Sequence, residues 1–372
     1  MFNIFIIILQ FDFNNICFFG SNGIELPQNE KIVNYLFILK KMRLIVNIPA
    51  YNEEKVIGQT IRRIKDSFKR DFYFTGIGNQ IEDKLIQIVD DGSDDKTVEA
   101  ARKAGADLIV SYKPNRRLAY SFKQAVGSAL ENRADIMVNI DADGQFDPED
   151  IPKLLEPILQ KKVDMVIANR FGEYKAENIP WIKNLLNRLA AKLIGFFLGH
   201  RIEDLTCGFR AHNQEALLRL NLTNVNFTYT QETIIDAIGK NLKLSWVPVK
   251  VTYFQDRESR IVSSVWKFVS NSSRIILKAI RDVRPLKFFG WPGLFFLFLS
   301  LIGFTVFLSN YFQTFKITPY LNYVFFSSLT LLLGIQLLIF ALIADMIKSN
   351  RRITEEIMYQ EKKQHLKKLS EN

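Results

Sequence analysis

Two long stretches without charged residues near the end of the chain restrict its fold more than any other feature. Residues 288–315 and 317–344 each run for 28 residues without Asp, Glu, Lys or Arg, and only Lys316 stands between them. A helix needs roughly 20 apolar residues to cross a bilayer, so each stretch is long enough to span one. Two buried core helices are the alternative interpretation, but such helices rarely exclude charge over this length. The sequence therefore predicts a membrane protein with two spans.

Basic residues flank the two stretches and predict their orientation. Three precede the first stretch and three follow the second: Arg281, Arg284, Lys287, Lys348, Arg351 and Arg352. Because Lys and Arg collect on the cytoplasmic side of a membrane, we expect both termini and the domain before the spans in the cytoplasm, with a short outward loop at residues 311–322. Residues 262–280 mix apolar with polar and basic residues, a pattern typical of a helix in the membrane interface. The tail from Lys348 is expected to form a solvated helix near anionic headgroups.

The net charge of the 372-residue chain, +10, suits nucleic acid, anionic membranes and phosphorylated substrates equally. The sequence has no zinc-ligand cysteine pattern, basic recognition helix or aromatic RNA-binding motif, and its Lys and Arg residues concentrate beside the two apolar stretches. A lipid bilayer is therefore an expected partner and nucleic acid is not. Cys17 and Cys207 stand far apart in dissimilar contexts, which argues against a disulfide framework or a cysteine metal site and fits a reducing compartment.

Short apolar segments alternate with helical patterns in the first half of the chain. Strands are predicted at residues 43–48, 84–90, 107–111, 135–141 and 163–169, and helices at 53–68, 96–104, 116–132 and 149–160. This alternation predicts an α/β fold with a mainly parallel sheet and helices on both faces. Ligands of such sheets bind outside the carboxyl ends of the strands, so the residues after the strands are the candidate site. The first 42 residues lack an organised pattern, which leaves two interpretations open: either Met42 is the natural start, or the segment is a membrane-associated arm.

Polar and acidic turns follow three of the predicted strands. The first turn, residues 49–54, reads Pro-Ala-Tyr-Asn-Glu-Glu and has neither the glycines of a dinucleotide fingerprint nor the Gly-Lys of a phosphate-binding loop. The second begins with Asp90 and Asp91, whose carboxylates suit a base or ribose, although an ordinary turn and helix cap explains them equally well. The third contains Asp141, Asp143 and Gln145, whose oxygens suit a divalent cation that also holds phosphates. A helix N-cap is the alternative there.

Taken in order, the segments IPAYNEE, VDDGSDDKT, DADGQFDPEDI and DLTCGFRA resemble those of the inverting glycosyltransferases of family 2, which have the GT-A fold. The two spans that follow make the chain most similar to polyprenyl-phosphate glycosyltransferases such as the dolichol-phosphate mannosyltransferases. The resemblance implies an N-terminal extension (1–42), a glycosyltransferase domain (43–260), a juxtamembrane helix (261–287), two transmembrane helices (288–347) and a cytoplasmic tail (348–372).

The resemblance also implies roles for individual residues. The nucleotide sugar would be held by Pro49, Ala50, Tyr51, Glu53, Asp90, Asp91, Asp141 and Arg210, and a divalent metal, Mg²⁺ or Mn²⁺, by Asp141, Asp143 and Gln145. The catalytic set would comprise Asp143, Asp204, Glu232, Arg257 and Arg260. Asp204 would lie on the sugar and acceptor side, and the last two arginines at the donor and acceptor phosphates.

Two segments depart from the family pattern. The segment from Arg257 to Arg260 lacks the glycine of the usual Arg-x-x-Gly-x-Ser-Lys and ends in Arg, which still binds phosphate, in a bidentate manner. Residues 115–119 read Asn-Arg-Arg-Leu-Ala where relatives carry a glycine-rich Asn-x-Gly-Lys-Gly. A further helical segment, residues 181–198, is expected either to lie on the membrane or to pack on the sheet as an ordinary helix.

The expected reaction is the inverting transfer of a hexose, of the mannose or glucose type, from a GDP- or UDP-sugar to polyprenyl or dolichyl phosphate at the cytoplasmic membrane face. A lipid phosphate is already ionised and needs positioning more than a base, whereas a hydroxyl acceptor needs a base such as Glu232 or Asp204. Transfer to a hydroxyl of a lipid-linked saccharide or polysaccharide is therefore one alternative, and a non-catalytic membrane-tethered binding protein is another. The sugar, the nucleotide base, the polyprenol and the oligomeric state are left open.

Overall fold

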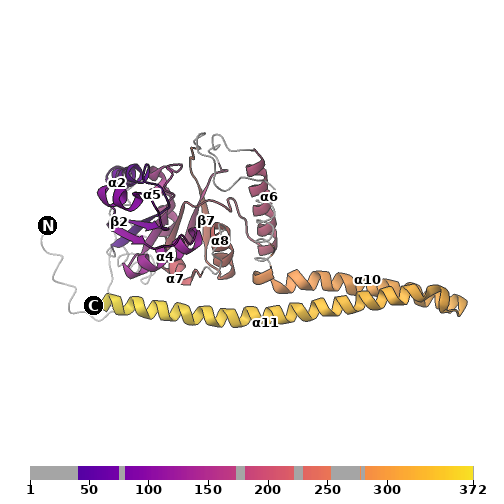
Figure 1. Cartoon of the computed structure of the whole chain (residues 1–372). Coiled ribbons are helices and arrows are strands. Elements are labelled where there is room, and N and C mark those ends of the chain that lie inside the picture. The colour runs from indigo at the N-terminus through magenta and orange to yellow at the C-terminus, as the bar shows by residue number, and fades with distance from the viewer. Residues whose placement is uncertain are drawn as a thin grey trace, which may run out of the picture. The chain divides into compact units, whose positions relative to one another are not determined.

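The computed structural model describes residues 41–74, 80–172, 181–221, 229–252, 277 and 281–371 (Figure 1). These residues form an α/β domain and, after it, a long helical hairpin. The predicted interfacial helix at residues 262–280 lies outside the described residues except for Leu277, and so do Arg257, Arg260 and the first 40 residues.

A seven-stranded sheet forms the centre of the domain. Its strands are β1 (Met42–Ala50), β2 (Ile81–Asp90), β3 (Leu108–Ser111), β4 (Ile136–Asn139), β5 (Met165–Asn169), β6 (Arg210–Asn213) and β7 (Leu244–Pro248). They lie in the order β3-β2-β1-β4-β6-β5-β7. Neighbouring strands are parallel, except that β6 runs antiparallel to both β4 and β5. The predicted α/β fold with a mainly parallel sheet is confirmed.

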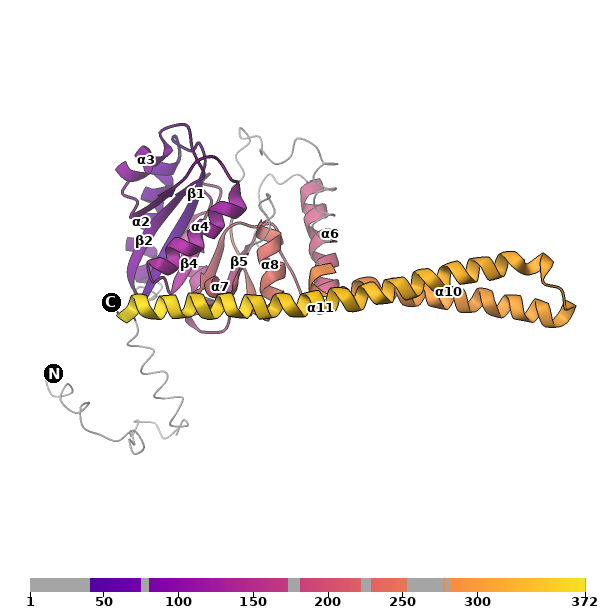
Figure 2. The ribbon, with the colours of Figure 1, turned by 60° about the horizontal axis from the view of Figure 1, so that its bottom comes forward.

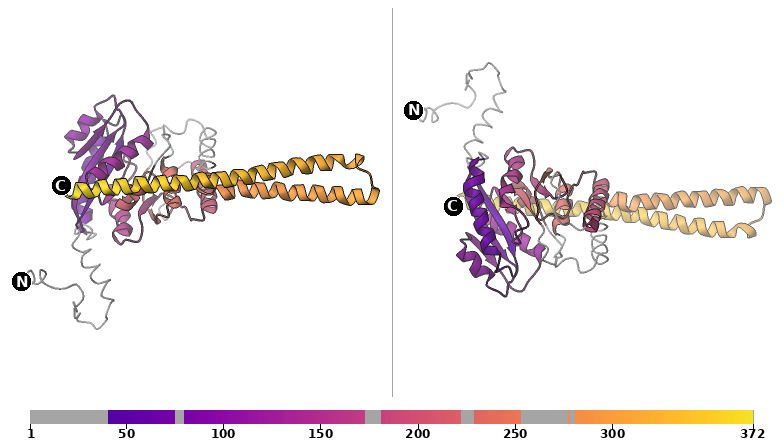
Figure 3. Two further views of the ribbon diagram at one scale, coloured as in Figure 1. Left: turned by 90° about the horizontal axis from the view of Figure 1, so that it is seen from below. Right: turned by 90° about the horizontal axis from the view of Figure 1, so that it is seen from above.

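Two groups of helices cover the two faces of this sheet (Figures 1 and 3). On one face α2 (Ile57–Phe74) lies beside α3 (Thr97–Lys103), the short 3-10 helix η3 (Pro148–Asp150) and α5 (Ile151–Leu159). On the other, α4 (Leu118–Glu131) contacts α7 (Gln214–Arg219) and α8 (Tyr229–Gly239). Because both faces are covered, the central strands are continuous apolar runs, and Leu44, Ile45 and Val46 of β1 are all completely buried.

Helix α2 begins at Ile57 rather than at the predicted Glu53. The backbone N–H of Glu53 donates to Thr97 Oγ1 at 2.8 Å, and that of Glu54 donates to Asp95 Oδ2 at 3.2 Å. These side chains from the turn after β2 hold residues 53 and 54 in a turn of their own. The helix therefore begins after the residues that bind the turn following β2.

The domain continues into two long helices that run back along each other. Helix α10 (Pro285–Thr314) is joined through η4 (Thr318–Tyr320) to α11 (Leu321–Glu371). Both are long and apolar enough to cross a membrane, which agrees with the two predicted spans. Small residues bring them close together: Ser300 Oγ donates to the backbone oxygen of Ser327 at 2.8 Å, and a Cβ added to Gly334 would lie 3.0 Å from the oxygen of Gly293.

The predicted tail is not a separate element. Helix α11 continues without a break past Lys348 to Glu371, and Figure 2 shows this part running beside helices α4 and α7 of the α/β domain. One of its side chains, Tyr359, is only 5% exposed. The tail therefore differs from the solvated helix that its composition predicts, because one of its faces is packed against the domain.

Candidate active site

The turns after β1 and β2 are joined to each other by side chains. The backbone N–H of Asn52 donates to Ser93 Oγ at 2.9 Å, and the N–H of Asp94 donates back to Asn52 Oδ1 at 3.0 Å. Gly92, directly before Ser93, has a φ of +77°, and a Cβ there would lie 3.0 Å from the oxygen of Tyr112. Only glycine satisfies both demands at this position. The predicted nucleotide-binding residues Pro49 and Ala50 end β1, and Tyr51 and Glu53 are half-buried in the turn that follows.

The carboxylates of Asp90 and Asp91 are buried and engaged within the protein. Asp90 accepts from the N–H of Ser93 at 3.1 Å and from Ser111 Oγ at 2.7 Å. Asp91 accepts from the N–H of Arg116 at 2.8 Å, which ties down the loop that departs from the family pattern. Both side chains therefore shape the turn, and their direct contact with a base or ribose stays a prediction.

The turn after β4 presents the candidate metal ligands. Asp141 and Asp143 are both half-buried, and the backbone N–H of Gln145 donates to Asp143 Oδ1 at 3.0 Å. Gly144 between them has a φ of +74°, which favours glycine at this tight turn. Helix α2 supports the turn from behind, because Thr60 Oγ1 donates to the oxygen of Ala142 at 2.9 Å.

The electrostatics of this turn favour a cation. Desolvation and the neighbouring charge of Asp143 raise the pKa of Asp141 well above its usual range, although Arg170 and Arg210 act in the opposite direction. In the described part of the chain no group of three or more His, Cys, Asp and Glu side chains stands ready to hold a metal. Two carboxylates and a nearby amide nevertheless suit a hard divalent ion that completes its shell with water and substrate phosphates.

A second motif, residues 204–210, reaches the same place from a distant part of the chain. A Cβ added to Gly208 would lie 2.9 Å from Asp141 Oδ2, so the absence of a side chain at this position lets the loop approach the carboxylate. The oxygen of Gly208 accepts from Asn139 Nδ2 at 3.1 Å. Asn139 in turn accepts from Asn47 at 2.7 Å, which accepts from Gln87 at 3.0 Å. A buried row of amides across β2, β1 and β4 thus supports the loop from below.

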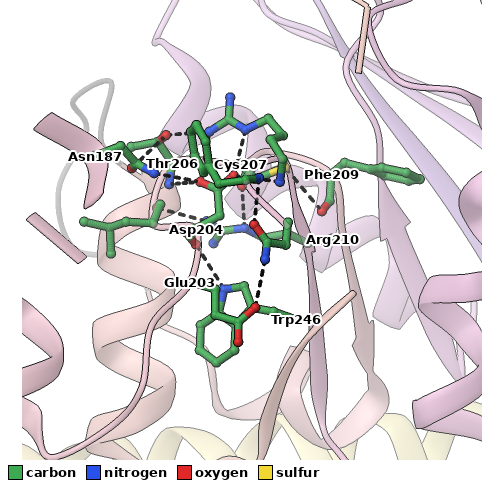
Figure 4. A network of polar contacts seen from close by, with 12 residues as sticks. Asn187, Glu203, Asp204, Thr206, Cys207, Phe209, Arg210 and Trp246 are labelled. Atoms are coloured by element: carbon green, nitrogen blue, oxygen red, sulfur yellow. Dashed lines mark hydrogen bonds and ion pairs between the residues drawn. The ribbon is translucent and has the colours of Figure 1, made fainter. Parts of the chain in front are cut away.

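Asp204 forms a buried ion pair with Arg170. Figure 4 shows Asp204 among its neighbours Asn187, Thr206 and Trp246. Arg170 Nε lies 2.7 Å from Asp204 Oδ2, and the two side chains are 9% and 0% exposed. Arg170 Nη2 donates to Asp204 Oδ1 at 2.9 Å, which makes the pair bidentate. Burial would raise the pKa of Asp204, but the charge and hydrogen bonds of Arg170 lower it below its usual value. Asp204 is therefore a poor proton acceptor, and its geometry fits a positioning role.

Neighbouring elements hold the loop around this pair. Trp246 Nε1 from β7 donates to the backbone oxygen of Asp204 at 3.1 Å. Asn187 from α6 (Trp181–Leu198) is 4% exposed; its Nδ2 lies 3.5 Å from Asp204 Oδ1, and its Oδ1 accepts from Thr206 Oγ1 at 3.3 Å. These contacts link α6 directly to the loop that reaches Asp141.

Arg210 lies behind the site rather than at its opening. It is 1% exposed, and its guanidinium donates to the oxygen of Cys207 at 2.7 Å, to the oxygen of Leu205 at 3.4 Å and to Thr233 Oγ1 of α8. Arg210 thus braces the 204–208 loop, and its charge opposes the rise in the pKa of Asp141. Its predicted contact with the nucleotide sugar stays a prediction. Cys207 is a buried free thiol whose pKa is raised to about 12 by burial, which makes it unreactive.

The remaining predicted residues belong to α8 and to the segment that follows β7. Glu232 is half-buried in the first turn of α8, next to Thr233. After β7 the chain returns to the turn after β4 that carries Asp141 and Asp143. The N–H of Thr252 donates to the oxygen of Gln145 at 3.1 Å, and Phe146 pairs with Val251. Arg257 and Arg260 follow this point, outside the described residues.

Sequence reasoning did not identify Arg170, Asn187, Asn139 or Trp246. Arg170 had a usable signal, because it directly follows β5 at the carboxyl edge of the sheet, where ligands bind. Asn187, Asn139 and Trp246 carry no such sequence signal. They support the 204–208 loop through contacts with residues that are 17 to 69 positions away in sequence.

Comparisons with known proteins agree with this arrangement. The family model for glycosyl transferase family 2 matches residues 45–220. An uncharacterised protein of Methanocaldococcus jannaschii is 32% identical over 226 residues, which cover 60% of this chain and 86% of that protein. The UDP-N-acetylglucosamine–dolichyl-phosphate N-acetylglucosaminyltransferase of Methanococcus voltae is 29% identical over 226 residues, 55% of this chain and 84% of that enzyme.

Among solved structures, the glucosyl-3-phosphoglycerate synthase of Mycobacterium tuberculosis matches with a TM-score of 0.48 and 21% identity, over 65% of this chain and 79% of that one. The residues that the family model matches include the turns after β1, β2 and β4 and the 204–208 loop. The chain belongs to glycosyltransferase family 2, and it is a glycosyltransferase.

Proposed function

We propose that this glycosyltransferase transfers a hexose of the mannose or glucose type, with inversion, from a GDP- or UDP-sugar to polyprenyl or dolichyl phosphate at the cytoplasmic membrane face. One observation carries the proposal: the Asp141–Asp143 turn and the Arg170–Asp204 pair meet in a domain whose chain continues into two candidate membrane spans. The name of the Methanococcus voltae relative, which specifies a nucleotide sugar and dolichyl phosphate, supports this substrate class.

Asp141, Asp143 and Gln145 would hold Mg²⁺ or Mn²⁺ together with the donor diphosphate. The bound cation would supply Lewis-acid stabilisation of the charge that develops on the leaving nucleoside diphosphate. The fixed turn between α2 and the 204–208 loop would keep the two carboxylates in place before the donor binds.

The acceptor chemistry follows from the state of the carboxylates. A lipid phosphate is already ionised near neutral pH, so Arg257 and Arg260 need only position it for attack on the face of the sugar opposite the leaving group. Asp204 is neutralised by Arg170 and does not serve as the base. If the acceptor were a hydroxyl, Glu232 would have to accept the proton.

The membrane side of the domain is proposed from α6 and the hairpin. Leu185, Leu189, Leu193 and Phe196 of α6 are 48%, 48%, 53% and 82% exposed, and their spacing puts them on one helical face. An apolar face of this kind fits a helix that rests on the bilayer. The basic residues beside the spans support a cytoplasmic position for the domain and both termini.

The test is sugar transfer into lipid. Radiolabelled GDP- and UDP-sugars are incubated with the purified protein, polyprenyl phosphate and Mg²⁺ or Mn²⁺, and Asp143→Ala is compared with wild type. We expect one donor to give a labelled lipid only with metal, and the variant to lose it. The absence of a labelled lipid with every donor would overturn the proposal.

The hydroxyl-acceptor alternative is tested in the same assay with lipid-linked saccharides. Glu232→Gln should keep nearly full activity on polyprenyl phosphate, because no base is needed there. If wild type labels a saccharide or polymer and Glu232→Gln loses that activity, the assignment moves to the alternative.

A further inference from the structure

The cytoplasmic end of α11 has one face that contacts the catalytic domain. We define its docking face by the residues Arg351, Glu355, Glu356, Tyr359, Lys362 and Leu366. Apart from the adjacent pair Glu355 and Glu356, they recur at intervals of three or four and therefore lie on one side of the helix. Their partners belong to α4, α7, α8 and the residues Asn221 and Lys240, which follow α7 and α8. Figures 1 and 2 show the helix lying along these elements.

Tyr359 is the anchor of this face. It is 5% exposed and belongs to the same apolar cluster as Phe122 and Ala129 of α4. Its hydroxyl donates to Glu215 Oε2 at 3.0 Å, and the guanidinium carbon of Arg219 lies 4.1 Å from the centre of its ring. A buried aromatic ring with a satisfied hydroxyl and a stacked guanidinium is typical of the centre of a specific interface.

Charged groups of opposite sign surround the anchor. Arg219 pairs with Glu356 at 3.5 Å, and Lys240 pairs with Glu355 at 3.5 Å. Lys362 Nζ donates to the oxygen of Leu218 at 3.2 Å and to Asn221 Oδ1 at 2.8 Å. The docked position is therefore specified by charge and hydrogen bonding as well as by apolar contact.

The elements that receive the helix also hold the site. Helix α4 begins just after Arg116, whose N–H binds Asp91, and Thr233 of α8 accepts from Arg210. The N-terminal part of the same helix is the second candidate membrane span. Ala344, the end of the uncharged stretch, and Tyr359 are separated by about 22 Å of helix, at 1.5 Å for each residue.

We propose that residues 348–369 of α11 form a strut that fixes the orientation of the catalytic domain on the membrane, so that its site faces an acceptor in the bilayer. This inference rests on the proposed function. A single helix that is at once a span and a docked partner of the domain leaves the domain little freedom to tilt. Releasing the strut should therefore impair delivery of the lipid acceptor while leaving donor binding and chemistry intact.

The experiment compares two tail variants in liposomes. Tyr359→Ala/Lys362→Ala removes the anchor and its neighbour. Met358→Ala/Lys368→Ala truncates one large side chain and one lysine at exposed positions of the same helix and is the control. Two rates are measured: hydrolysis of the donor by water, which needs no lipid acceptor, and transfer to polyprenyl phosphate. The docking itself is followed by the distance between spin labels at Lys123→Cys and Gln364→Cys, in a Cys17→Ser background where Cys207 stays buried.

We expect the docking variant to lose transfer by about tenfold to a hundredfold, a range typical of misplaced reactants, with unchanged hydrolysis and a broadened label distance. The control should match wild type in all three measurements. Equal losses of both rates, unchanged transfer, or a distance that stays narrow would overturn the strut. If the double variant does not accumulate, Glu356→Arg, which faces Arg219 with a like charge, takes its place.

Failure of the proposed function gives a different result. Wild type would then transfer nothing to polyprenyl phosphate, and the comparison is repeated with a lipid-linked saccharide as acceptor. The strut predicts the same selective loss of transfer there. Equal transfer by both variants to that acceptor would overturn it.

Discussion

At the residue scale, the site depends on close contacts between motifs that are far apart in sequence. Gly208 and Asp141 show this most directly, because the loop that carries Gly208 approaches the carboxylate without space for a side chain. The motifs themselves predict which turns matter. They do not predict that Asp90 and Asp91 are buried and engaged, or that Asp204 is neutralised by Arg170, since these facts arise only when the chain folds.

Gly208→Ala tests the contact with Asp141. Its Cβ would meet Asp141 Oδ2 at 2.9 Å and displace the carboxylate. We expect transfer to fall by about 10- to 100-fold, with a higher metal concentration needed for half-maximal activity, because shifted ligands bind metal less well. Gly127→Ala is the control, since a Cβ there meets nothing within 4 Å. Unchanged metal dependence in Gly208→Ala would show that the loop does not position the carboxylate.

Asp204→Asn tests the buried ion pair. The change leaves Arg170 charged and buried without its partner, so we expect a loss of about 3–5 kcal/mol of stability at neutral pH. Thermal unfolding in detergent measures it, with Glu131→Gln as an exposed control.

The pH dependence of this loss has a defined sign. The pKa of Asp204 is lower in the folded protein than in the unfolded chain, where it is about 3.9. The pair therefore contributes its stability above that value and loses it as the pH falls through the folded pKa. Wild type should keep its advantage over Asp204→Asn at pH 5 and lose it in stronger acid. An advantage that disappears between pH 7 and pH 5 would contradict this assignment.

At the scale of elements, periodicity and charge predict most of what is observed. The parallel strands β1 to β5 and both long apolar helices were expected, because strands buried on both faces and membrane spans leave strong apolar runs in the sequence. Strand β6 was not expected. It is four residues long and reads Arg-Ala-His-Asn, so its polar residues give no strand pattern. They are buried there because the 204–208 loop and the neighbouring strands surround them.

The packing of the hairpin gives a prediction at this scale. Gly334 lies against Gly293 and Leu297, so Gly334→Leu should force α10 and α11 apart. Overpacking of this kind costs about 1–3 kcal/mol. Resistance of the purified protein to unfolding by SDS measures the effect. Gly290→Leu, at a position where a Cβ meets nothing within 4 Å, should have little effect. Equal effects of the two changes would show that the close approach is unimportant.

At the scale of the whole molecule, the fold joins an α/β domain that carries the candidate site to two candidate membrane spans. The turns after β1, β2 and β4 form one edge of the sheet, and the chain then passes through the hairpin and returns along α4, α7 and α8. This return explains why composition alone misjudged the tail: its charged residues are those of a solvated helix, but several of them bind partners on the domain.

The central claim is that the acceptor is a phosphate, and the stability of the product to acid tests it most directly. The labelled lipid formed by wild type is treated with mild acid and analysed by mass spectrometry. We predict that the sugar is released and that the original polyprenyl phosphate is recovered, as for a sugar joined through its anomeric carbon to a phosphate. Label that stays in a lipid after this treatment, or that is released within a larger saccharide in which the sugar is joined to a hydroxyl, would contradict the account.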